Sequence, residues 1–174
     1  MSNFESQTRK WIEEIVIGLG LCPFAAKVYF EDRINFKVGS VLEPAELFSQ
    51  FNEEIQGIVD GACDTSIIIL NDDPEDFQDY LDLLEVLRNT LKKDELNEKV
   101  QLASFHPKFQ FENADPNDIE NYTNRSPFPL IHILKVEDVA QAIENHPDIH
   151  SVSVKNIETL KKLGMQGLLK LMSH

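Results

Sequence analysis

The residues with the densest chemistry in this chain lie at positions 121–127. The run Asn-Tyr-Thr-Asn-Arg-Ser-Pro carries two carboxamides, three hydroxyls and a guanidinium, more hydrogen-bonding capacity than a surface turn needs for its own backbone. A guanidinium among amides and hydroxyls suits bidentate capture of a carboxylate or phosphate. We therefore predict that Arg125 binds an anionic ligand, with Tyr122, Asn124 and Ser126 beside it.

The same polar residues have a structural interpretation. Arg125 would then hold the loop in place through backbone carbonyls or through an acidic neighbour, of which Asp115, Asp118 and Glu120 are the candidates. Asn and Ser also occur in turns merely to satisfy backbone groups. The sequence leaves both interpretations open.

A histidine and a cysteine are the candidate catalytic residues. His106 ends an apolar run and precedes Pro107, where a strand-end histidine suits general acid–base catalysis or simply bonds to the following loop. Cys22 precedes Pro23, and proline favours the first turn of a helix. A thiol at that N-cap would be activated by the helix dipole, so we predict a nucleophilic Cys22 beside His106. The alternative is a core cysteine, which is how we interpret Cys63.

Two more residues complete the predicted site. His132 lies inside an apolar run, where a buried imidazole must find a partner, and Asn71 follows another apolar run. His106 and His132 would approach each other if their strands pair. Catalytic zinc normally takes three protein ligands, and the sequence has no tight His/Cys/Asp cluster. We therefore predict no metal site, and the sequence indicates no cofactor.

Composition excludes several classes of partner. Thirty acidic against sixteen basic residues give a formal net charge of −14, the wrong sign for nucleic acid or an anionic membrane as a general partner. No run approaches transmembrane length, and no export signal begins the sequence. Two cysteines make no disulfide framework, so we expect a cytoplasmic protein with both thiols reduced. The oligomeric state is not indicated.

Hydrophobic periodicity predicts a single domain, 1–174, of α/β (or α+β) class. The expected strands are 34–38, 65–70, 100–105 and 130–134. The expected helices are 3–19, 23–29, one from Pro44 to near Gly61, one capped by Asp73 that runs to Leu91, 137–145 and 153–163, with a short helical tail after Gly164.

The order of these elements predicts the sheet and the place of the site. Helical crossovers make the first three strands parallel, and the fourth, which follows a loop, is expected to be antiparallel and adjacent to the third. The sheet is thus expected to be mostly parallel. Asn71, His106 and residues 125–129 then share one edge, where ligands of open α/β sheets bind.

Several runs resemble the motifs of a bacterial family known as a domain of unknown function. They are Leu-Cys-Pro-Phe-Ala at 21–25, Ala-Ser-Phe-His-Pro at 103–107, 121–129 with His132, and 156–164. The resemblance covers nearly the whole chain and implies kinship, with no reaction, cofactor or partner attached. From the residues we expect a small-molecule enzyme acting on an anionic substrate at the strand-end cleft. The alternative is a non-catalytic ligand-binding or protein-interaction module that uses the 107–128 loop.

Overall fold

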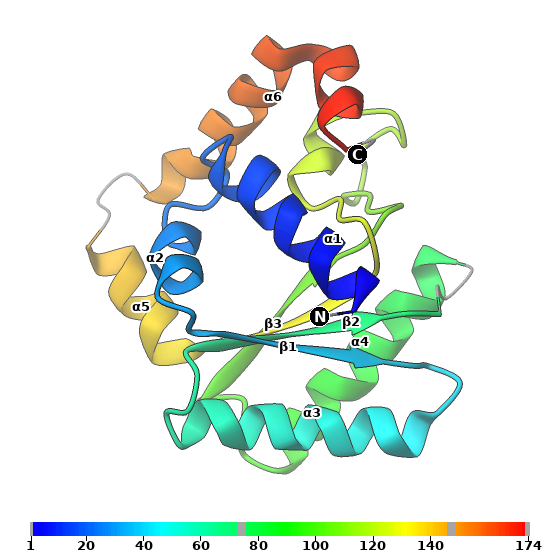
Figure 1. Ribbon diagram of the computed structural model, residues 1–174, viewed down its shortest axis with the longest axis vertical. Helices are drawn as coiled ribbons and strands as arrows, with labels where there is room; N and C mark the ends of the chain where they lie inside the picture. Colours follow the sequence, from blue (N-terminus) through cyan, green and yellow to red (C-terminus); the bar gives the residue numbers. More distant parts are fainter. Residues whose placement is uncertain (1, 73–75, 146–148, 173–174) are drawn as a thin grey trace.

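A four-stranded mixed sheet separates two layers of helices in the computed structural model, which describes residues 2–72, 76–145 and 149–172 (Figure 1). The strands are β1 (Ile34–Gly39), β2 (Thr65–Leu70), β3 (Val100–Phe105) and β4 (Leu130–Lys135), in the order β1-β2-β4-β3. β1 pairs parallel with β2, whereas β4 pairs antiparallel with both β2 and β3. The fold is α+β.

The sheet is mixed, which corrects the expectation of a mostly parallel one. β2 and β3 run in the same direction and β4 is antiparallel beside β3, as predicted, but β4 also separates β3 from β2. The reason is visible in its residues. Leu130, Ile131 and Ile133 are fully buried on alternate faces, and a strand apolar on both faces is most stable in the interior of a sheet.

Two long amphipathic helices cover one face of the sheet, the lower face in Figure 1. α3 (Pro44–Val59) begins with proline in its first turn, and α4 (Phe77–Lys93) begins after Asp76, whose side chain accepts from the Gln78 amide. Their apolar stripes pack with Ile68 and Ile131 of the sheet. The cap of α4 is Asp76, and the predicted cap, Asp73, lies outside the described residues.

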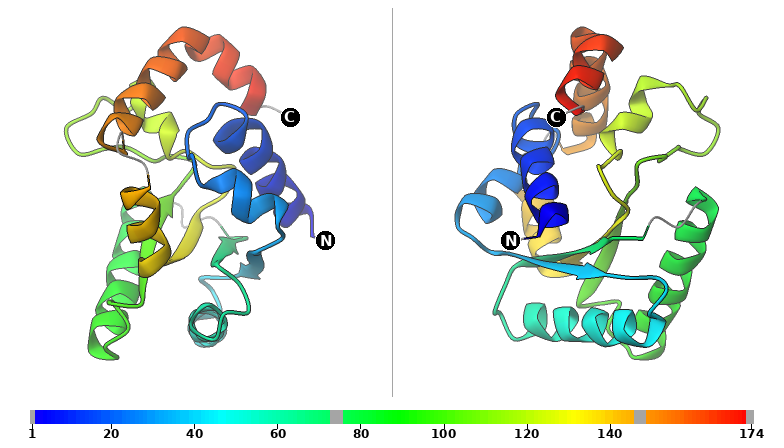
Figure 2. Two further views of the ribbon diagram at one scale, coloured as in Figure 1. Left: turned by 90° about the vertical axis from the view of Figure 1, so that its left-hand side faces the viewer. Right: turned by 45° about the vertical axis from the view of Figure 1, so that its right-hand side comes forward.

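The other face carries the remaining helices (Figure 2). They are α1 (Asn3–Trp11) with its π-helical continuation η1 (Ile12–Ile17), α2 (Ala25–Phe30), α5 (Val136–Glu144) and α6 (Ile149–Met172). A short 3₁₀ helix, η2 (Ile119–Thr123), lies in the long loop between β3 and β4. Gly164 breaks the helical path of α6 with a φ of 73°, which glycine adopts readily.

α2 begins later than the sequence suggested. Its first residue is Ala25 and its cap position is Phe24, so Cys22 is not the N-cap of this helix. Residues 22–25 instead form a turn in which the Ala25 amide donates to the Cys22 carbonyl at 3.4 Å. The thiol therefore lies in the connection between η1 and α2, ahead of the helix and not on its first turn.

Candidate functional site

Arg125 fixes the long loop between β3 and β4. Its Nε donates to the carbonyl of Phe109 at 3.1 Å, and its Nη2 donates to the carbonyl of Pro116 at 2.7 Å. The guanidinium carbon lies 4.3 Å from the centre of the Tyr122 ring, in cation–π geometry. These contacts are those of the structural interpretation, in which the guanidinium closes the loop on itself.

The neighbouring polar side chains make similar bonds. Asn121 is fully buried, and its carboxamide bonds to three backbone groups of the same loop. The Asn124 Nδ2 donates to the Ser104 carbonyl near the end of β3 at 3.2 Å. The Ser126 hydroxyl donates to the Phe128 carbonyl at 2.5 Å. Most of the polar capacity of residues 121–127 therefore serves the backbone around it.

His106 is fully buried on the face covered by α3 and α4. Its ring lies 5.1 Å from that of Phe77 and 5.0 Å from that of Tyr80, both on α4, and its Nδ1 accepts from the Lys108 amide at 3.0 Å. Cys22 lies on the opposite side of the sheet, against η1 and α2. The structure does not bring together the predicted pair of Cys22 and His106.

His132 lies on the same side of the sheet as Cys22. Side chains alternate along β4, so His132 faces α1 while Ile131 and Ile133 face α3 and α4. Its Nε2 is 2.7 Å from the Thr65 hydroxyl of β2, the strand beside it. His132 and His106 thus occupy opposite faces and do not share a site.

The hydrogen bonds of Thr65 determine the tautomer of His132. The Thr65 hydroxyl is also 2.6 Å from the carbonyl of Ile133, which can only accept. A hydroxyl has one proton, and since it goes to that carbonyl, the Thr65 oxygen must accept from the Nε2–H of His132. In the neutral ring the lone pair then resides on Nδ1. No described residue forms a hydrogen bond to this atom.

Burial keeps this imidazole uncharged. Loss of solvent lowers the pKa of His132 from 6.5 to about 4, because the cation is the form that burial disfavours. At neutral pH the ring is therefore a hydrogen-bond acceptor at Nδ1 and a donor at Nε2.

His132 and Cys22 both line a cavity of about 310 Å³ between the sheet and the helices above it. We call it the inner cavity. Its walls come from α1, η1, α2, α5 and all four strands, and include Trp11, Val28, Phe105 and Leu130. The lining is almost wholly apolar, so a ligand there would be largely removed from water.

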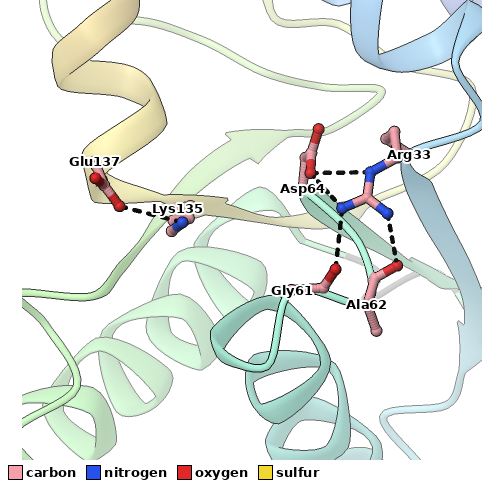
Figure 3. Close-up of polar contacts among 6 residues, drawn as sticks. All are labelled: Arg33, Gly61, Ala62, Asp64, Lys135 and Glu137. Carbon is pink, nitrogen blue, oxygen red and sulfur yellow. Dashed lines mark hydrogen bonds and ion pairs between the residues drawn. The ribbon is translucent and has the colours of Figure 1, made fainter.

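Charged residues surround one end of the inner cavity, where β2 begins and β4 ends (Figure 3). Asp64 is held by Arg33, whose Nη2 and Nε lie 2.7 and 3.0 Å from its Oδ1, and Arg33 also donates to two carbonyls of the turn before β2. Lys135 is paired with Glu137 at 3.2 Å. Among the charged residues that line the cavity here, Asp64 and Lys135 have partners of opposite sign, and Asp138 lines the same end.

A second, wider cavity of about 760 Å³ lies between η2 and the first turns of α6. We call it the outer cavity. Its polar lining consists of Glu120, Thr123, Asn124, Ser153 and Asn156. Val16, Cys22 and Phe105 line both cavities, so the half-buried Cys22 lies where the two meet.

A hydrogen bond from α6 holds the backbone next to Cys22. The Nδ2 of Asn156 on α6 donates to the carbonyl of Leu21, the preceding residue, at 2.7 Å. The amide of Cys22 donates to no acceptor within the described ranges. The segment is thus anchored at Leu21 while the Cys22 thiol and amide are left for other partners.

Arg125 and Asn71 line neither cavity. Arg125 borders a separate open depression of about 550 Å³ with Lys108, Gln78 and Asn117. Asn71 follows β2 with an exposed side chain, and its amide donates to the Gly39 carbonyl at 3.0 Å. The structure therefore does not bring the predicted site residues together in one site.

Thr65, Phe105 and Asn156 contribute to the site without having been predicted. Thr65 was only the first residue of an expected strand, and its role depends on β2 and β4 being neighbours. A polar residue that begins a buried β-branched strand is the one signal that could have drawn attention to it.

The sequence model of one family, described as "Protein of unknown function (DUF1415)", matches residues 3–170. The chain belongs to this family. The match confirms the resemblance seen in the sequence, and the membership carries no reaction for a DUF1415 chain. Comparison with curated proteins and with solved structures returns no match.

The described part of this DUF1415 chain lacks two features that would point to a class of function. In the described ranges, no helix has the length and apolar character needed to cross a bilayer. Over the same residues, no group of three or more His, Cys, Asp or Glu side chains is arranged to hold a metal ion.

Proposed function

We propose that this protein is an enzyme that acts on a small molecule bound in the inner cavity, with Cys22 as nucleophile and His132 as the residue that orients the substrate. The observation that carries the proposal is the position of Cys22 at the meeting point of two cavities, one of which is also lined by His132. Covalent catalysis needs a nucleophile that a bound substrate can reach.

The two cysteines differ in a way that favours Cys22. Cys22 is half-buried, whereas Cys63 is buried and burial raises the pKa of its thiol. A thiol that resists ionisation inside the protein is a poor nucleophile. Cys22 is thus the better candidate for covalent chemistry, and the cytoplasmic setting that keeps thiols reduced is part of the proposal.

The nucleophile can be tested on its own with a small activated ester, which reacts with the thiol without needing a hydrogen bond to His132. With p-nitrophenyl butyrate, the Cys22 sulfur would attack the carbonyl carbon, forming a thioester and expelling p-nitrophenolate, with the thiol proton released to solvent. We expect intact-mass and peptide analysis to find one butyryl group on Cys22 in the wild type and in Cys63→Ala, and none in Cys22→Ala. Acylation of Cys22 at the rate of a free thiol in solution would contradict the proposal.

The depression beside Arg125 supports a second candidate function, that of a non-catalytic module which binds an anionic molecule through the 107–128 loop. Arg125 and Lys108 both line it, and the Nη1 of Arg125 bonds to no described group. Titration with inorganic phosphate, followed by NMR of labelled protein, would test it. Saturable shifts of residues around Arg125 that are absent in Arg125→Met would support this candidate, and unchanged spectra would remove it.

A further inference from the structure

The outer cavity has several polar lining residues, whereas the inner cavity is mostly apolar with His132 in its wall. The size, charge and hydrogen-bonding groups of the inner cavity therefore restrict the kind of ligand that it can bind. We infer that the molecule bound in the inner cavity is a compact, uncharged apolar compound bearing one hydroxyl or N–H group, which donates a hydrogen bond to Nδ1 of His132. This inference deepens the proposed function, since it names the substrate class for the same site.

Volume limits the size of the ligand. The inner cavity measures about 310 Å³, and at about 30 Å³ for a water-sized group it holds roughly ten such groups. A substituted aromatic ring or a short branched chain fits this space. Cys22 lines both cavities, so the rest of a larger substrate can extend past it into the outer cavity, which is more than twice as large.

Charge excludes an anion from the inner cavity. Apart from Thr65, Gln101 and His132, the sheet and helix residues that line its body are apolar, and none of these three supplies a positive charge at neutral pH. Lys135 lies at the charged end, where Glu137 already pairs with it and Asp64 and Asp138 also line the cavity. A carboxylate or phosphate placed against the apolar lining would lose its hydration without an ionic partner.

The tautomer selects a donor over an acceptor. Because the proton on Nε2 is donated in a hydrogen bond to the Thr65 oxygen, Nδ1 has only a lone pair to offer. A ligand hydroxyl or N–H satisfies that lone pair, whereas an ether or ketone oxygen at the same place leaves two acceptors facing each other. A site built to bond a donor rejects the analogue that lacks it, since its own polar atom is then left unpaired.

Trp11 makes the inference measurable, because it is the single tryptophan of the chain and lines the inner cavity, with its ring 5.4 Å from that of Phe105. The probes are 4-ethylphenol, its methyl ether and 4-ethylbenzoate, which share a ring and an ethyl group. We expect the phenol to change Trp11 fluorescence saturably, with a Kd about fivefold or more below that of the ether. We expect no saturable change with the benzoate.

Two histidines on opposite faces of the sheet provide a matched pair of variants. His132→Phe keeps a ring in the cavity and removes the acceptor, so the preference for the phenol over the ether should fall to about one. His106→Phe alters the ring packed against α4 and should leave the preference unchanged. If either variant fails to fold, long-range proton–nitrogen NMR of wild-type His132 replaces it, with 4-ethylphenol expected to shift the Nδ1 resonance and leave Nε2 protonated.

Equal affinity for the phenol and its methyl ether, or tighter binding of the benzoate, would overturn the inference. So would a phenol preference that survives in His132→Phe. The adduct on Cys22 distinguishes failure of this inference from failure of the proposed function. A butyryl group on Cys22 with no phenol preference refutes the ligand class alone, while a phenol preference with no adduct refutes the nucleophile alone.

Discussion

Replacing His132 with glutamine should remove a defined part of the acid sensitivity of this protein. Glutamine can still donate to the Thr65 hydroxyl, which His132 does at 2.7 Å, but it does not titrate. The wild-type imidazole is different, because burial lowers its pKa from 6.5 to about 4 in the folded protein. The two proteins should therefore diverge in stability as the pH falls.

The direction of the stability change follows from the pH at which the folded and the unfolded state each protonate His132. Below pH 6.5 the unfolded chain protonates His132, while the folded protein resists protonation until about pH 4. Between these values protons favour the unfolded state, so the wild type loses stability as pH falls. At about 1.4 kcal/mol for each pKa unit, the full difference is about 3 kcal/mol. Above pH 7 the stability difference between wild type and variant should be constant.

Urea unfolding followed by Trp11 fluorescence at several pH values from 8 to 4.5 would measure this effect. Subtracting the variant from the wild type cancels the titration of all carboxylates and of the other histidines. We expect the difference in unfolding free energy to fall by about 2 to 3 kcal/mol across the range, mostly below pH 6.5. Parallel curves would show that His132 is well solvated, and the account of a dry inner cavity would be refuted.

Other contacts give predictions of known direction. The Tyr80 hydroxyl donates to the Leu130 carbonyl at 2.7 Å and accepts from the Phe105 amide at 3.0 Å, so Tyr80→Phe should cost about 2 to 4 kcal/mol in urea unfolding. A loss well below 1 kcal/mol would mean that water replaces the hydroxyl. Arg125→Ala removes two bonds to loop carbonyls and should cost about 1 to 2 kcal/mol, with faster proteolysis between β3 and β4. An unchanged cleavage pattern would refute that role. Iodoacetamide should alkylate Cys22 well before buried Cys63, as peptide mass analysis would show, and the reverse order would contradict the assigned exposures.

Local sequence patterns predicted where the strands and helices lie along the chain better than they predicted which strands pair with each other. The bounds of β2 and β3 agree with the strands expected at 65–70 and 100–105, because β-branched and apolar runs of that length have few alternatives. The insertion of β4 between them is a non-local pairing, which periodicity does not encode. The contact between Thr65 and His132 follows from that pairing and was therefore missed.

Residue type also could not decide which polar groups face a ligand. Arg125 and Asn124 were prominent in the sequence because of their chemistry, yet their donors reach carbonyls of Phe109, Pro116 and Ser104. The number of side-chain donors in a loop does not show how many of them are used by the backbone carbonyls of the same region, which also need hydrogen-bond partners. Cys22 was recognised for its thiol, but its expected partner changed because strand alternation assigns His106 to the far face.

The central claim, that Cys22 is a nucleophile beside a cavity lined by His132, is tested most directly by one protected-labelling measurement. The protein is treated with p-nitrophenyl butyrate with and without saturating 4-ethylphenol, and the butyryl group is located by peptide mass spectrometry. The account predicts a single label on Cys22 that forms faster than on a free thiol and is slowed by the phenol. Label on Cys63, no label, or label on Cys22 at an unchanged rate when the phenol is bound would contradict it.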